Sequence, residues 1–96
     1  MNSDVSRATY RWLVSGRVQG VAFRWFVLSA ARQLGVLGWV RNLPDGRVDV
    51  VGQGNPEVLS ILDGKLRDGP RLSHVQNVEK TDITHEVDGL NSFEIR

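Results

Sequence analysis

The order of hydrophobic patterns along the chain is the feature that most restricts its fold. Residues 23–34 and 56–68 carry apolar side chains at helical spacing, and a glycine follows the end of each segment. Four other segments contain alternating or short apolar runs, which are typical of strands. These are residues 8–18, the hairpin 37–52, the less regular 75–83 and the short segment 92–95. The predicted order is therefore strand, helix, strand, strand, helix, strand, with one small strand added.

Two helices on one face of a mostly antiparallel sheet are the economical arrangement for this order. It is the ferredoxin-like α+β fold, β-α-β-β-α-β, also described as a split βαβ. Because crossover connections are right-handed, strands one and two should be parallel, with strand three between them. The loop after the first strand and Asn42 at the end of the second then share one end of the sheet. Two strand spacings, roughly 10 Å, should separate them.

Three local details qualify this pattern. Leu13 breaks the alternation of the first strand, so we expect the outer face of the sheet to be partly covered. Val75 and Val78 have the wrong spacing for strict alternation, which predicts a bulge or an irregular edge strand. The turn Leu43–Gly46 should close the hairpin, and we expect the hairpin's second strand to end at Gly52–Gly54.

Residues Ser15–Arg24 lead from a strand through a loop with two glycines into a helix. Gly16 and Gly20 permit backbone angles and close approaches that a Cβ would prevent. The start of a helix presents free N–H groups and a positive dipole end, which together favour anions. Arg24 adds a planar guanidinium that can hold two phosphate oxygens. We therefore predict a phosphate site formed by the loop residues and Arg24, namely Gln19, Gly20, Val21, Ala22, Phe23 and Arg24.

The chemistry available at this end of the sheet is limited to positioning and positive charge. The predicted site holds peptide N–H groups, Arg24 and the carboxamide of Asn42, without a histidine, a cysteine or a pair of carboxylates. Such a site suits phosphoryl transfer with a good leaving group, because the loose transition state mainly needs its oxygens held and its charge neutralised. A carboxylate departs without being protonated, so an acyl phosphate fits these limits and an ordinary phosphate ester does not. No carboxylate cluster is evident that would hold a magnesium ion.

Two stretches carry a resemblance to a known family. Gly16–Arg24 (GRVQGVAFR) and Gly38–Val48 (GWVRNLPDGRV), with Gly54 downstream, resemble the two signature sequences of acylphosphatase. The likeness extends from Ala8 to Ile95. It implies hydrolysis of acyl phosphates without a metal or cofactor, with inorganic phosphate as product and inhibitor. By the same resemblance Arg24 binds the substrate phosphate and Asn42 orients the attacking water.

Some side chains keep two interpretations. Gln19 could hydrogen-bond the loop or contact the substrate. Trp25 lies nearly opposite the apolar stripe of its helix, so we expect a partly exposed aromatic beside Arg32, while its closeness to Arg24 leaves ligand stacking open.

RNA binding is a rival function for this fold, but the predicted third strand, Val48–Gly52, has no aromatic residue to stack on bases. A catalytically idle domain is a second rival, and the presence of Arg24 and Asn42 disfavours it.

Composition predicts an ordinary small protein. The 96 residues suffice for one domain, expected over 8–96 with a flexible tail at 1–7. A net charge of +1 predicts no general attraction to nucleic acid or to a membrane. The absence of cysteine excludes disulfides and thiolate chemistry. The polar N-terminus and the lack of a long apolar run predict a cytoplasmic protein, which we expect to be a monomer.

Overall fold

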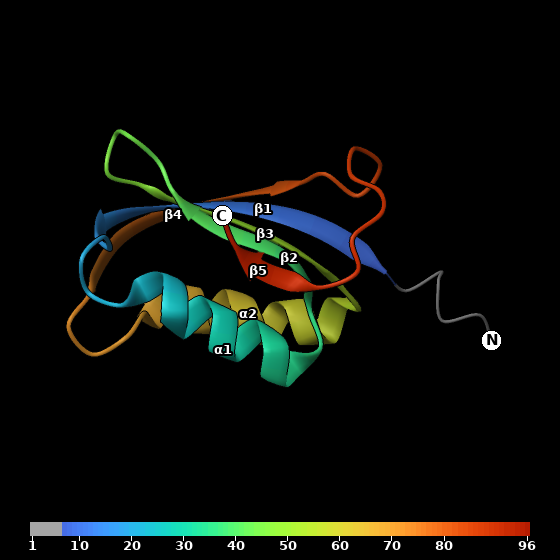
Figure 1. The fold of residues 1–96 in the computed structure, drawn as a ribbon, viewed down its shortest axis with the longest axis horizontal. Helices are drawn as coiled ribbons and strands as arrows, with labels where there is room; N and C mark the ends of the chain where they lie inside the picture. Colours follow the sequence, from blue (N-terminus) through green and yellow to red (C-terminus); the bar gives the residue numbers. More distant parts are fainter. Residues whose placement is uncertain (1–6) are drawn as a thin grey trace.

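The computed structural model describes residues 7–96, so all but the last residue of the expected tail 1–7 lies outside the described residues. Within them the predicted order of elements is confirmed, and both helices cover one face of a five-stranded sheet (Figure 1). The elements are β1 (Ala8–Arg17), α1 (Phe23–Leu34), β2 (Leu37–Asn42), β3 (Val48–Gly54), α2 (Pro56–Asp68), β4 (His74–Asp82) and β5 (Phe93–Ile95). Neither of these helices is long and apolar enough to cross a membrane.

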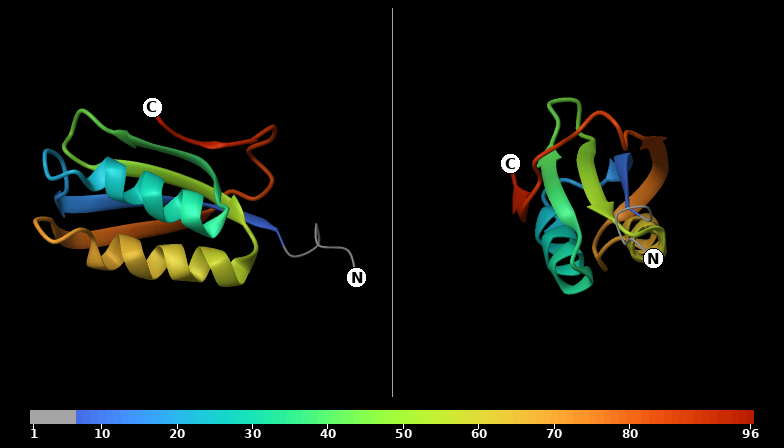
Figure 2. Two further views of the ribbon diagram at one scale, coloured as in Figure 1. Left: turned by 60° about the horizontal axis from the view of Figure 1, so that its bottom comes forward. Right: turned by 90° about the vertical axis from the view of Figure 1, so that its right-hand side faces the viewer.

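The strand order of the sheet is β4-β1-β3-β2-β5. Both β1 and β2 pair with β3 in the antiparallel sense, so β1 and β2 run parallel to each other with β3 between them, as predicted. The short β5 adds to the outer edge of β2 in the parallel sense. The carboxyl ends of β1 and β2 therefore lie at one end of the sheet, which Figure 2 shows from the side of the helices.

The core lies between the sheet and the two helices. Its largest fully buried side chains include Trp12 from β1, Phe23 from α1 and Leu62 from α2. Trp12 also donates a hydrogen bond of 2.9 Å from its indole Nε1 to Asp63, which ties β1 to α2. The helical and alternating patterns of the sequence thus correspond to the faces that are buried.

Strand β3 is longer than predicted. It continues through Gly52–Gly54, where the sequence pattern was expected to end it. A Cβ added at Gly52 would lie 3.1 Å from the Trp12 ring and 3.1 Å from Val36. A side chain at position 52 would press against both neighbours, so this glycine reflects tight packing in the core rather than the end of the strand.

The outer face of the sheet is partly covered, as the break at Leu13 indicated. The segment 83–92 between β4 and β5 runs over this face, opposite the helices (Figure 1). Beneath it the carboxylate of Asp49 is fully buried and pairs with Arg11 at 2.8 Å and Arg41 at 2.9 Å. The hydrogen bond and the charge of Asp49 raise the pKa of Arg11 despite its partial burial. This ion cluster joins β1, β3 and β2.

The predicted irregularity of the fourth strand is also confirmed. Ser15 of β1 faces Asn77, but Gly16 faces Val75, so Gln76 is an extra residue in β4. Gly16 has φ +125°, and a Cβ there would lie 2.2 Å from the His74 carbonyl oxygen. Only glycine allows β1 and β4 to approach this closely at the point where the chain turns into the loop.

Candidate active site

The loop between β1 and α1 enters the helix through an unusual backbone conformation. Gly20 has φ +74°, and Ala22, the residue that caps α1, has φ 60° and ψ 25°. Ala22 is the only residue other than glycine with positive φ in the described chain. An L-residue in this left-handed region costs about 1–2 kcal/mol, so the surrounding structure must hold it there.

The start of α1 remains open to an anion. Ala22 provides no side-chain cap, and the first turn of the helix contains no acidic residue. The first N–H groups of a helix have no partner within the helix, and its dipole makes that end positive. In α2, by contrast, the Asn55 side chain accepts a 3.1 Å hydrogen bond from Val58 N–H, and Glu57 lies in the first turn. Local charge therefore favours an anion at α1.

A cavity of about 150 Å³ lies at this helix start. It is lined by Val18, Gly20, Ala22, Phe23, Arg24, Trp25 and Asn42. The fold thus brings together five of the predicted site residues, including Arg24 from α1 and Asn42 from β2. Gln19 and Val21 do not line the cavity. The right-handed crossover had predicted that the loop and Asn42 would lie at one end of the sheet, and both line this cavity.

Arg24 contributes a half-buried positive charge to this cavity. Arg11, Arg41 and Arg47 each form an ion pair with a carboxylate. Within residues 7–96, Arg24 has no such ion pair. Its guanidinium can therefore bind a phosphate without first breaking a contact inside the protein.

Asn42 offers a second unused polar group. It is the last residue of β2, and its side-chain Oδ1 is buried without a hydrogen-bond partner among the described residues. Leaving a buried acceptor unpaired costs about 1–3 kcal/mol. Asn42 lines the cavity, so its carboxamide is suited to hydrogen-bond a water molecule beside a bound anion.

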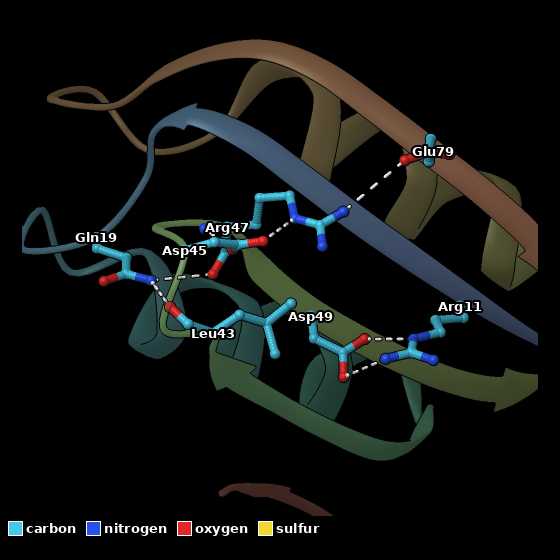
Figure 3. Close-up of polar contacts among 7 residues, drawn as sticks. All are labelled: Arg11, Gln19, Leu43, Asp45, Arg47, Asp49 and Glu79. Carbon is cyan, nitrogen blue, oxygen red and sulfur yellow. Dashed lines mark hydrogen bonds and ion pairs between the residues drawn. The ribbon is translucent and has the colours of Figure 1, made fainter.

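Gln19 joins the loop after β1 to the turn between β2 and β3 (Figure 3). Its Nε2 donates to the carbonyl oxygens of Leu43 at 2.9 Å and Arg47 at 3.0 Å, both in the β2–β3 turn. Asp45 closes that turn by accepting from the backbone N–H of Arg47 at 3.1 Å. The same N–H, aided by the Arg47 guanidinium, lowers the pKa of the Asp45 carboxyl. The side chain of Gln19 thus makes the loop hydrogen bonds that one of its two interpretations predicted.

Two cavity residues, Val18 and Trp25, were not in the predicted set. Val18 is a buried core residue, and the sequence left Trp25 between exposure and ligand stacking. Trp25 lines the cavity with 66% of its surface exposed.

Among residues 7–96 there is no group of three or more His, Asp or Glu side chains placed to hold a metal ion.

The fold and this cavity define a small ferredoxin-like α+β protein with a site suited to an anion, and the comparisons give its family. The acylphosphatase family model matches residues 10–95. The acylphosphatase of Koribacter versatilis is 55% identical over 87 residues, which cover 91% of this chain and 78% of the relative. The acylphosphatase structure from Coxiella burnetii has a TM-score of 0.92 at 34% identity, covering 100% of this chain and 99% of that one. The chain belongs to the acylphosphatase family.

The left-handed Ala22 yields a stability prediction. Ala22→Val should lower the free energy of unfolding by about 1–2 kcal/mol, because a β-branched side chain is strongly disfavoured at positive φ. Ala22→Gly is the matched control and should be at least as stable as the original protein, since glycine adopts this conformation freely. Urea unfolding measures both. Equal stability of the valine and glycine variants would show that residue 22 is not held in this conformation.

Proposed function

We propose that this protein hydrolyses acyl phosphates to a carboxylate and inorganic phosphate in the cavity at the start of α1. Its family membership makes it a hydrolase acting on acyl phosphates. The phosphate is held by the loop amides of residues 19–23 and by Arg24, and Asn42 orients the attacking water. The observation that carries this assignment is that Asn42, whose buried Oδ1 has no partner among the described residues, lines one cavity with Arg24 and the open helix start.

The proposed reaction needs no protein base. Water donates a hydrogen bond to Asn42 Oδ1 and attacks phosphorus, while the bond between phosphorus and the acyl oxygen breaks. The carboxylate leaves with the bonding electron pair, and a phosphate oxygen of the substrate takes the proton of the water. Arg24 and the helix start stabilise the negative charge on the phosphate oxygens as the bond breaks.

The proposal needs neither a metal nor a cofactor, because the cationic groups of the protein neutralise the phosphate. Inorganic phosphate, which carries the same group, should bind as product and inhibitor. Nothing in the proposed reaction requires a nucleic acid, a membrane or a second subunit. The cytoplasmic location and the monomeric state expected from the sequence stay predictions.

Substrate choice and metal independence test the reaction itself. The protein should hydrolyse benzoyl phosphate at an undiminished rate in the presence of EDTA and should leave p-nitrophenyl phosphate intact. The physical reason is that benzoate is a less basic anion than p-nitrophenolate and therefore the better leaving group in a site that offers only positioning and positive charge. Loss of activity with chelator, or hydrolysis of the ester, would contradict the proposed mechanism.

Replacement of Arg24 tests phosphate binding. Arg24→Ala should lower kcat/KM for benzoyl phosphate by about a hundredfold or more, because a positioned donor to the reacting group is lost. Arg24→Lys should also lose at least about tenfold, since an ammonium cannot reproduce a two-pronged contact. Arg32→Ala on the exposed part of the same helix serves as the control for loss of a positive charge. Near-normal hydrolysis by Arg24→Ala would remove this residue from the mechanism.

Asn42 should act on water more than on phosphate. Asn42→Ala is expected to lower kcat by about a hundredfold, while the inhibition constant of inorganic phosphate stays within about threefold. The matched control is Asn77→Ala, at an exposed position of β4. Steady-state kinetics with phosphate as competitor separates the two effects. Equal losses in turnover and phosphate affinity would instead make Asn42 a binding residue.

A further inference from the structure

Trp25 combines a large apolar surface with a position at the cavity. Among the described residues, three large hydrophobic side chains are exposed: Trp25 (66%), Ile61 (51%) and Leu72 (74%). Single exposed hydrophobic residues are common and need no explanation. Of these three, however, Trp25 alone lines the cavity that contains Arg24 and Asn42. Trp25 is therefore an exposed aromatic residue that also borders the proposed substrate site.

The fold makes little use of the Trp25 ring. The neighbouring Phe23 and Phe26 pack into or against the core and form a ring pair with 6.2 Å between centroids. The other ring pair in residues 7–96 joins Tyr10 and Trp12. Cations lie over the rings of Tyr10 and Trp39, each within about 4.3 Å of the centroid. In the described chain Trp25 takes part in none of these contacts and does not belong to the core.

An acyl phosphate has two chemically different halves. In the proposed mode its phosphate lies against Arg24 and the helix start, so its acyl group must extend past the residues that line the cavity. Trp25 directly follows Arg24 in the helix and lines the same cavity. An indole offers a broad, flat, apolar surface, and aromatic groups stack on such a surface in offset or tilted arrangements. The exposed ring is thus positioned to meet the acyl half while Arg24 holds the phosphate.

We propose that Trp25 binds the acyl group and makes the enzyme prefer acyl phosphates with an aromatic acyl group over those with a small aliphatic one. This inference rests on the proposed function and assigns the substrate class for the same cavity. Trp25 has no part in breaking the bond to phosphorus. It discriminates between substrates through contact with the group that leaves as carboxylate.

The test compares two substrates on one set of variants. Trp25→Ala should lower kcat/KM about three- to tenfold more for benzoyl phosphate than for acetyl phosphate, chiefly by raising KM. Trp25→Phe should restore most of the preference, because a flat ring is kept. Ile61→Ala removes another exposed apolar side chain away from the cavity and should leave the ratio of the two substrates unchanged. Thermal unfolding should show that all three variants are folded.

Inhibition provides a readout that does not depend on turnover. Trp25→Ala should weaken inhibition by benzylphosphonate about three- to tenfold more than inhibition by methylphosphonate. Equal losses for the aromatic and the methyl compound would overturn the inference and make Trp25 a residue that positions the loop. If both phosphonates inhibited Trp25→Ala as well as they inhibit the original protein, the inference would also be overturned. The exposed ring would then serve another partner, such as a protein.

Failure of the proposed function would look different from failure of this inference. If the original protein hydrolysed neither acyl phosphate, the reaction assignment would be wrong. If it hydrolysed both and Trp25→Ala left their ratio unchanged, the reaction assignment would stand and only the role of Trp25 would be lost.

Discussion

The pairing of β3 with two strands is the constraint on which the rest of the structure depends. β3 lies between β1 and β2 and runs antiparallel to both, so the two neighbours must end on the same side. That arrangement brings the loop after β1 and the last residue of β2 to one cavity. The buried Asp49, paired with Arg11 and Arg41, reinforces the same three strands on the outer face. The start of α1 with Arg24 and the carboxamide of Asn42 thereby meet although they are distant in sequence.

Much of this arrangement could be predicted from the sequence, because the relevant signals are local. The helical spacing of apolar residues and the glycines that end each helix located α1 and α2. Handedness of the crossover then placed Arg24 and Asn42 at one end of the sheet. Even the bulge opposite Gly16 was indicated by the spacing of Val75 and Val78.

What the sequence did not predict depends on contacts between distant segments. An alanine gives no sign of left-handed geometry, so the conformation of Ala22 could not be foreseen. The role of Gln19 stayed undecided because its two acceptors lie in another turn of the chain. The extension of β3 through Gly52 depends on what packs against it, since glycine in a strand pattern otherwise suggests an end or a bulge.

The bracing of the loop by Gln19 has a consequence for ligand binding. Its two hydrogen bonds end on main-chain oxygens of a turn that Asp45 itself closes, so the loop after β1 and the β2–β3 turn are held together. The loop is thus joined to the turn before a ligand binds, which lowers the conformational entropy that binding has to remove.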